Sequence, residues 1–207
     1  MCCCARGVAM PSFKVTALRH TAPEISSGIC YGVLDLPVDA DEVLHTARQW
    51  VESGAASAMP YQGVLLTSPL QRCALLAQAI KDLRPDVQLV QDPRLMEMNF
   101  GCFEGVPWDD VPQANWDAWL ADFAHHPFGG VESVAQFMQR VQQAISPWVP
   151  HGRVTCVTHA GVIKALSLWA QGIHQPSLAA QWPIVSVAYG QALDIEFAQG
   201  FEFQLKI

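Results

Sequence analysis

Arginine and histidine side chains follow three apolar runs of the sequence, at the points where strands are expected to end. Arg19 and His20 come directly after the first run, Arg72 shortly after the second, and His159 directly after the third. In an open parallel sheet, ligands bind beyond the carboxyl ends of the strands, so these side chains are expected to share one pocket. Two arginines, two histidines and the N-termini of the following helices favour an anion, and the size of the site suits a phosphate.

The elements that must position these residues follow a repeated strand–helix pattern. Apolar runs predict strands, and 3.6-residue periodicity predicts helices. The predicted strands cover residues 13–20, 64–67, 87–90 and 153–158, and the predicted helices cover 38–53, 69–83, 112–124, 131–148 and 159–172. This alternation indicates an α/β fold, a three-layer α/β/α sandwich with a mostly parallel central sheet. The alternating C-terminal tail suggests closing strands or an antiparallel edge.

The domain organisation is expected to be simple. The length of 207 residues suits one domain, which we place at residues 13–207, after a disordered leader at residues 1–12. Residues 97–148 are rich in Trp and Gly and predict a helical insertion over the active site. Its tryptophans, Trp108, Trp116 and Trp119, could form a lid or simply pack the insertion onto the sheet.

Composition narrows the possible partners and the compartment. A hydrophobic content of 51% can fill a core, and the net charge of −7 argues against a general nucleic-acid surface. No apolar run is long enough to span a membrane and no secretory signal is visible, so a cytoplasmic protein is expected. The scattered cysteines look like reduced thiols, whereas Cys2–Cys4 could bind a metal or belong to the leader. We expect no resident metal or cofactor; a small phosphorylated metabolite is the expected partner, and a homodimer stays open.

Five short motifs, taken in order, carry a resemblance to a known family. They are LRHTAPEISSGICYGVLDLP, SPLQRC, EMNFGCFEG, GGVES and VTHAGVIKAL, spread from about residue 13 to at least residue 170. Together they resemble the histidine phosphatase superfamily, also called phosphoglycerate-mutase-like. The segment after the first histidine looks most similar to the branch that contains α-ribazole-phosphate phosphatases of cobalamin biosynthesis.

The resemblance implies a role for each candidate residue. His20 would be the nucleophile that forms a phosphohistidine, and Arg19 and Arg72 would bind the phosphoryl group with forked donors. His159 would be the second catalytic histidine and would also contact the phosphate. Glu97 would be the general acid that protonates the leaving oxygen, and it could later activate the hydrolytic water. Positioning and charge stabilisation carry most phosphoryl transfer, so the reaction needs no metal.

Two positions depart from the family pattern. Thr21 stands where the first motif usually has glycine, and its hydroxyl could reach the phosphate. Val33 stands where related α-ribazole phosphatases usually have arginine, which puts that substrate in doubt. The mutase branch also uses an asparagine after the first histidine that this stretch lacks.

Several other residues keep two interpretations. Glu104 is read as a structural residue, with an arginine as its suggested partner. Thr67 and Ser68 could lend hydroxyls to the pocket or cap the following helix, and capping is favoured. The pair His125-His126 could mark a helix end or lie near the mouth of the pocket.

These features predict a metal-independent phosphomonoester hydrolase acting through His20, with α-ribazole 5′-phosphate as the best single substrate. A phosphoglycerate mutase is the first rival, although such mutases carry extra segments that this short chain lacks. A phosphate-binding regulatory protein without turnover is the second rival. A phosphatase of protein phosphohistidine is the third, and it would need a shallower pocket than a Trp-rich insertion suggests.

Overall fold

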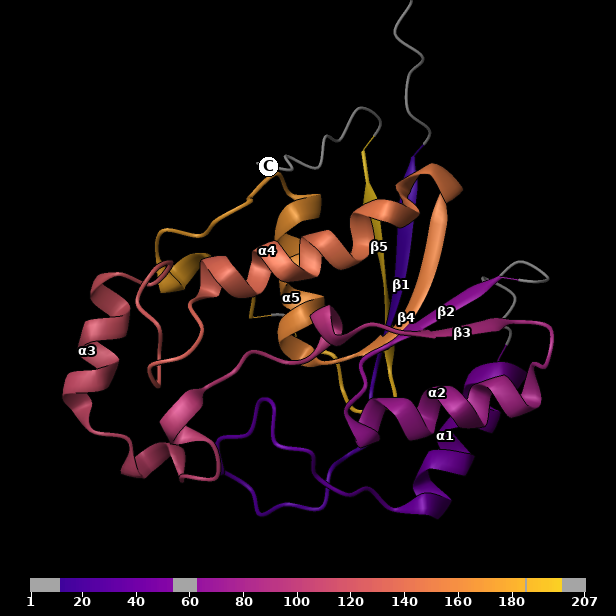
Figure 1. Cartoon of the computed structure of the whole chain (residues 1–207), viewed down its shortest axis with the longest axis horizontal. Helices are drawn as coiled ribbons and strands as arrows, with labels where there is room; N and C mark the ends of the chain where they lie inside the picture. Colours follow the sequence, from indigo (N-terminus) through magenta and orange to yellow (C-terminus); the bar gives the residue numbers. More distant parts are fainter. Residues whose placement is uncertain (1–11, 54–62, 185, 199–207) are drawn as a thin grey trace, which may run out of the picture.

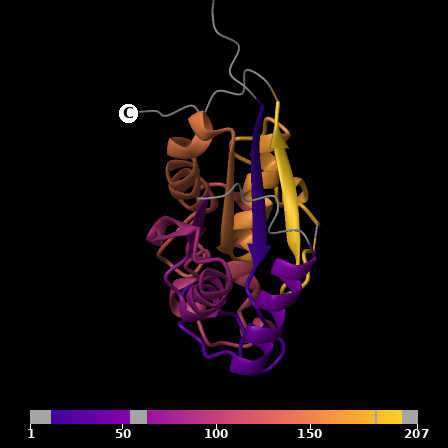
Figure 2. The ribbon, with the colours of Figure 1, turned by 90° about the vertical axis from the view of Figure 1, so that its right-hand side faces the viewer.

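The computed structural model describes residues 12–53, 63–184 and 186–198, and these residues contain a sheet of five strands. The strands are β1 (Phe13–Arg19), β2 (Val64–Thr67), β3 (Gln88–Gln91), β4 (Arg153–Thr158) and β5 (Ala192–Phe197). Their order in the sheet is β3-β2-β4-β1-β5. β5 lies antiparallel to β1 at one edge, and the other neighbouring pairs are parallel (Figure 2). The predicted mostly parallel sheet with an antiparallel edge is therefore confirmed.

The register of the central strands brings their carboxyl ends to one level. Arg19, the last residue of β1, pairs with Thr158, the last residue of β4. The ladder continues past the strands, because the backbone N–H of His20 donates to the Thr158 carbonyl at 3.0 Å. The N–H of Ser68, after β2, donates to the Val157 carbonyl at 3.2 Å. Residues just beyond β1, β2 and β4 consequently emerge at the same edge of the sheet.

Helices cover both faces of the sheet and make the three layers (Figure 1). α1 (Ala40–Glu52) and α2 (Gln71–Leu83) pack on one face, and α4 (Val134–Ile145) and α5 (Ala160–Ala170) pack on the other. Side-chain capping hydrogen bonds mark the N-termini of two of these helices. The Asp39 carboxylate accepts from the N–H of Glu42 at the start of α1, and Ser133 and Gln136 form a reciprocal capping box at the start of α4.

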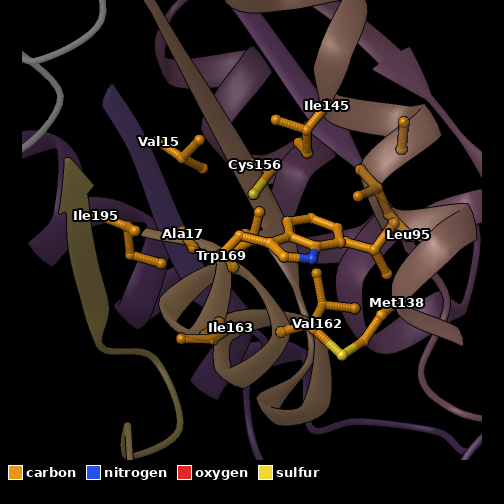
Figure 3. Close-up of a cluster of buried hydrophobic side chains, with 14 of the residues drawn as sticks. Val15, Ala17, Leu95, Met138, Ile145, Cys156, Val162, Ile163, Trp169 and Ile195 are labelled. Carbon is orange, nitrogen blue, oxygen red and sulfur yellow. The ribbon is translucent and has the colours of Figure 1, made fainter. Parts of the chain in front are cut away.

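The strands divide their side chains between two apolar clusters. On β1, Val15 and Ala17 face the α4–α5 layer and Leu18 faces the α1–α2 layer, as the two-residue period of a strand requires. Figure 3 shows the larger cluster, where the indole of Trp169 lies among Val162, Met138 and their neighbours. Trp169 is 1% exposed, so this ring anchors α5 against the sheet and fixes the helix that follows His159.

The segment predicted as a helical insertion has two structural parts. Its first part contains short 3₁₀ turns and α3 (Gln113–Ala121), and its aromatic side chains surround the fully buried Phe128. The rings of Trp108 and Trp116 both contact Phe128, which lies within the insertion, so these two tryptophans pack the insertion against itself and not onto the sheet. Its second part is α4, which belongs to the main core through side chains such as Phe137.

The described residues contain neither a membrane-spanning helix nor a metal-binding cluster. In this part of the chain, no helix is long and apolar enough to cross a membrane. The same residues contain no group of three or more His, Cys, Asp or Glu side chains that could hold a metal ion. The described cysteines are free thiols, of which Cys30, Cys73 and Cys156 are buried and Cys102 is exposed. Cys2–Cys4 and all but the last residue of the predicted leader (residues 1–12) fall on residues 1–11, outside the described ranges.

Candidate active site

His20 stands directly after β1 and is 2% exposed. Its Nδ1 lies 2.6 Å from the carbonyl oxygen of Thr21. A carbonyl can only accept, so Nδ1 carries the hydrogen and Nε2 keeps the lone pair. Burial, followed by the positive charge of Arg72, lowers the pKa of His20 to about 3. The imidazole is therefore neutral at physiological pH, as a nitrogen nucleophile must be.

His159 is the N-cap residue of α5 and is fully buried beside His20. The two rings are 5.0 Å apart between centroids, and burial, followed by proximity to His20, lowers the pKa of His159 well below its usual value. Its Nε2 lies 2.9 Å from the Ser68 hydroxyl. That hydroxyl oxygen also accepts from the N–H of Leu70 at 3.3 Å, whereas Thr67 turns its own hydroxyl to the Ser68 carbonyl. The Ser68 hydroxyl therefore contacts both the backbone N–H of Leu70, in the turn before α2, and the ring of His159.

Arg72 lies in the first turn of α2 and is fully buried. Its Nη1 donates to the Leu34 carbonyl and its Nη2 donates to the Gly32 carbonyl, each at 2.6 Å. Charge-assisted bonds of this kind are among the stronger ones in proteins. They fix the plane of the guanidinium and tie the loop after β1 to α2.

Arg19 is held from the other side of the site. Its Nη1 donates to the Val187 carbonyl at 2.7 Å, and its guanidinium carbon lies 3.9 Å from the centre of the Tyr189 ring. Among the described residues, the Nε atoms of Arg19 and Arg72 and the hydroxyl of Thr21 are buried without a hydrogen-bond partner. Buried polar groups are rarely left unpaired without a functional reason. Three residues predicted to bind phosphate therefore retain donors for a ligand.

A pair of tyrosines covers these cations, and the sequence reasoning did not find it. The hydroxyls of Tyr31 and Tyr189 are 2.6 Å apart, and the Tyr189 ring centre is 5.6 Å from that of His20. The guanidinium of Arg72 lies 5.5 Å from the Tyr31 ring. Burial, followed by the bond to Tyr189, raises the pKa of Tyr31 well above its usual value. Tyr31 lies inside the motif LRHTAPEISSGICYGVLDLP, so the sequence offered a reason to examine Tyr31. Tyr189 lies in none of the five motifs.

Glu97 lies against the first turn of α5, just after His159. Its Oε2 accepts from the N–H of Gly161 at 2.9 Å and its Oε1 accepts from the N–H of Met98 at 3.0 Å. A Cβ at Gly161 would come within 2.1 Å of Oε1, so only glycine permits this approach. The structure thus places the predicted general acid next to the helix that carries His159.

Glu104 is a structural residue, but its partners are backbone amides and not an arginine. Its carboxylate accepts from the N–H groups of Gly32, Val33 and Leu34 in the loop after β1, and from that of Phe100. These four bonds have lengths between 2.8 and 3.1 Å. They fix the loop whose carbonyls receive Arg72, so Glu104 supports the site indirectly.

Arg140 of α4 holds the segment that carries Glu97. Its Nη1 donates to the carbonyl of Met96 at 2.6 Å, and its Nη2 donates to the carbonyl of Glu97 at 2.7 Å. Its partner Glu132, from the motif GGVES, also accepts from the N–H of Asn99 at 2.9 Å. The sequence analysis missed Arg140, because a lone arginine on a helix carries no signal for such a role.

The pair His125-His126 is placed away from these residues. His125 lies 2.6 Å from the side-chain amide of Gln175, and both line a groove of about 580 Å³. The same groove is lined by His174, after α5. Its lining comes from the segments around α4 and after α5, so it forms a surface feature separate from the cluster around His20.

Comparison with known proteins assigns the family. Residues 15–196 match the model of the histidine phosphatase superfamily (branch 1), which is most of the chain. The chain therefore belongs to this superfamily, and the resemblance seen in its motifs is confirmed.

Similar proteins carry several different names. One curated relative, "Putative phosphoserine phosphatase 2" of Hydrogenobacter thermophilus, is 28% identical over 77% of this chain and 79% of its own length. A solved mycobacterial glucosyl-3-phosphoglycerate phosphatase superposes with a TM-score of 0.69 at 22% identity, covering 88% of this chain and 89% of that one. The α-ribazole phosphatase of Shigella flexneri has a TM-score of 0.69 at 23% identity, with the same coverage of each chain. The solved structures establish the fold of this chain.

Proposed function

We propose that this chain is a phosphomonoester hydrolase that acts through a phosphohistidine at His20. The observation that carries the proposal is the set of buried, unpaired donors on Arg19, Arg72 and Thr21 beside a neutral His20. A phosphoryl group at this position would pair those donors with its oxygens. The family and its phosphatase-named relatives support the same reaction class.

The first chemical step forms the phosphoenzyme. The Nε2 lone pair of His20 attacks phosphorus, and the bond between phosphorus and the ester oxygen breaks. The electron pair of that bond goes to the leaving oxygen, which takes a proton from Glu97. Arg19 and Arg72 offset the charge on the equatorial oxygens, so the step needs positioning and no metal.

The second step releases phosphate. A water molecule attacks the phosphohistidine, the P–N bond breaks, and its electron pair returns to His20. The Glu97 carboxylate takes the proton of that water, which restores the acid for the next cycle. His159 contributes a further neutral imidazole beside His20. Its Nε2 is held by the Ser68 hydroxyl and its ring lies against the Cys73 thiol. We infer that it donates a hydrogen bond to a phosphoryl oxygen.

For the substrate, α-ribazole 5′-phosphate of cobalamin biosynthesis remains the best single proposal. The motif after His20 and the fold shared with an α-ribazole phosphatase support it. The similarity to a protein named as a phosphoserine phosphatase makes phosphoserine the substrate to compare it with. A small phosphorylated metabolite is the common element of both.

The test is phosphate release by the purified protein in the presence of a chelator. The panel holds α-ribazole 5′-phosphate, phosphoserine, 3-phosphoglycerate, sugar phosphates and p-nitrophenyl phosphate, with a bisphosphoglycerate-primed mutase assay beside it. We expect hydrolysis with a preference for one metabolite and no mutase activity. Release from no substrate, with vanadate still bound, would favour the non-catalytic phosphate-binding protein.

A further inference from the structure

A cavity of about 200 Å³ lies between α3, α4 and α5, and aromatic side chains dominate its wall. The rings come from segments far apart in the sequence: Phe100, Trp119, Phe123, Phe137 and Trp182. Their centres lie close together, with 5.0 Å between Trp119 and Phe123 and 6.1 Å between Phe123 and Trp182. Trp119 and Trp182 are only half-buried, although each also packs against neighbouring rings.

The cavity reaches the place where the leaving group of the reaction must lie. Glu97, the proposed general acid, forms part of the wall together with Gly161, two residues after His159. A general acid must contact the oxygen it protonates. The alcohol attached to that oxygen therefore has this cavity as its neighbouring space.

One cationic side chain adds a second requirement. Lys164, one turn further along α5, also lines the cavity. An ammonium group can donate hydrogen bonds but cannot accept them, so an occupant that offers acceptor atoms suits this wall better than one without them.

We propose that the cavity binds the alcohol half of the substrate, and that this half carries a flat aromatic ring with hydrogen-bond acceptors. The inference rests on the proposed function and specifies its substrate class. A cavity of about 150 Å³ is enough to bind benzene, so this one can take a substituted ring. A bare sugar fits less well, because its many hydroxyls would face Phe, Met and Val side chains without partners.

A matched pair of substrates tests the proposal. α-Ribazole 5′-phosphate and methyl riboside 5-phosphate share the phosphorylated ribose and differ mainly in the aromatic base. Burial of one ring predicts a kcat/KM about 10- to 100-fold higher for the first. Trp182→Leu should reduce this ratio at least about threefold, because a ring-stacking partner is lost.

A second tryptophan provides the matched control. Trp148 is half-buried and contacts the ring of His151, after α4 and away from the cavity wall. Trp148→Leu should leave the substrate ratio unchanged. Far-UV circular dichroism and inhibition by vanadate, both measured on Trp182→Leu, would show that the variant is folded and its phosphoryl site intact.

A binding measurement separates failure of this inference from failure of the proposed function. Calorimetric titration with α-ribazole, which lacks the phosphate, reports on the cavity without turnover. Equal kcat/KM for both esters would overturn the aromatic leaving group and leave the phosphatase in place. No hydrolysis, but α-ribazole binding that Trp182→Leu weakens and Trp148→Leu does not, would support the cavity assignment and overturn the hydrolase. Neither hydrolysis nor binding would overturn both.

Discussion

The two ends of the site are built by different means. At the phosphoryl end, His20, Arg72 and His159 are almost completely buried, and backbone carbonyls or strand register fix their positions. At the leaving-group end, half-buried rings such as Trp119 and Trp182 come from a loop-rich insertion and from the segment after α5. In the proposed mechanism, the chemistry of the reaction therefore depends on the sheet, whereas the choice of substrate depends on side chains that can change without disturbing the sheet.

The two glutamates of the motif EMNFGCFEG show the same division at close range. Glu97 faces the cavity and accepts from Gly161 at the start of α5. Glu104, seven residues later, gives its carboxylate to four backbone N–H groups and holds the loop that receives Arg72. Glu97 lines the cavity proposed to receive the leaving group, whereas the carboxylate of Glu104 is fully used by the fold.

Replacement of the nucleophile should have the largest effect. His20→Ala removes the atom that forms the bond to phosphorus, so kcat should fall by at least about 10⁴-fold for every ester. The measurement is phosphate release together with far-UV circular dichroism, which should show an intact fold. Substantial activity in this variant, on any substrate, would remove the phosphohistidine mechanism.

Glu97→Gln separates the two ends of the site. Proton donation matters for an alkoxide leaving group and little for p-nitrophenolate, which leaves without a proton. We expect about a 10³-fold loss of kcat on an alkyl phosphate and a much smaller loss on p-nitrophenyl phosphate. Glu104→Gln is the control, since its effect should be on stability and be the same for both substrates. Equal losses on both esters in Glu97→Gln would take Glu97 out of the acid role.

Arg72→Lys should weaken the phosphoryl end while keeping its charge. Lysine cannot reproduce the forked donors that hold the Gly32 and Leu34 carbonyls and leave Nε for the ligand. Loss of one such donor predicts a fall of about 10²-fold in kcat/KM, shared by all esters. Inhibition by vanadate, measured beside turnover, should weaken in parallel. A change in substrate ratio without loss of vanadate binding would contradict the division between the two ends.

Acid should destabilise the fold through the buried histidines. The pKa of His20 is lowered to about 3, whereas an unfolded histidine titrates near 6.5. As pH falls below that unfolded value, the unfolded chain binds the proton and the folded chain does not, so the free energy of unfolding decreases down to about pH 3. The loss is at most about 1.4 kcal/mol per pH unit for each such group.

Thermal unfolding between pH 7 and pH 4 measures this loss. His20→Asn should flatten the dependence of Tm on pH, and the same change at the exposed His45 should not. Identical slopes in the wild type and both variants would mean that His20 takes up its proton in the folded state.

Most residues of the phosphoryl end could be predicted from the sequence. The residues that hold them in place mostly could not. Arg19, His20, Arg72 and His159 stand at strand ends or in the following helix turns, and parallel strands must bring such positions to one edge. Arg140, in contrast, acts through contacts with backbone atoms more than forty residues away. No local pattern encodes a contact of that kind.

The same limit applies to the aromatic cavity and to Glu104. Periodicity predicted helices in the insertion, but it could not say that Trp108, Trp116 and Trp119 all pack on Phe128 or that Trp119 also lines a cavity. The arginine suggested for Glu104 was wrong, because three backbone amides of the loop after β1 and the amide of Phe100 satisfy the carboxylate. The packing of these tryptophans and the partners of Glu104 both depend on tertiary contacts between loops that are distant in the sequence.

Substitution of Tyr189 should have the smallest effect, because Tyr189 contacts Arg19 through its ring and Tyr31 through its hydroxyl. Tyr189→Phe keeps the ring under Arg19 and removes the bond to Tyr31, whereas Tyr189→Leu removes the ring as well. A cation–π contact of this kind predicts that Leu raises the inhibition constant of vanadate about 2- to 10-fold and that Phe leaves it near the wild-type value. If the variants instead weaken vanadate equally, the link between the two loops, and not the stacking on Arg19, orients the cation. In either case the substrate ratio set by the aromatic cavity should stay constant, since Tyr189 lies at the other end of the site.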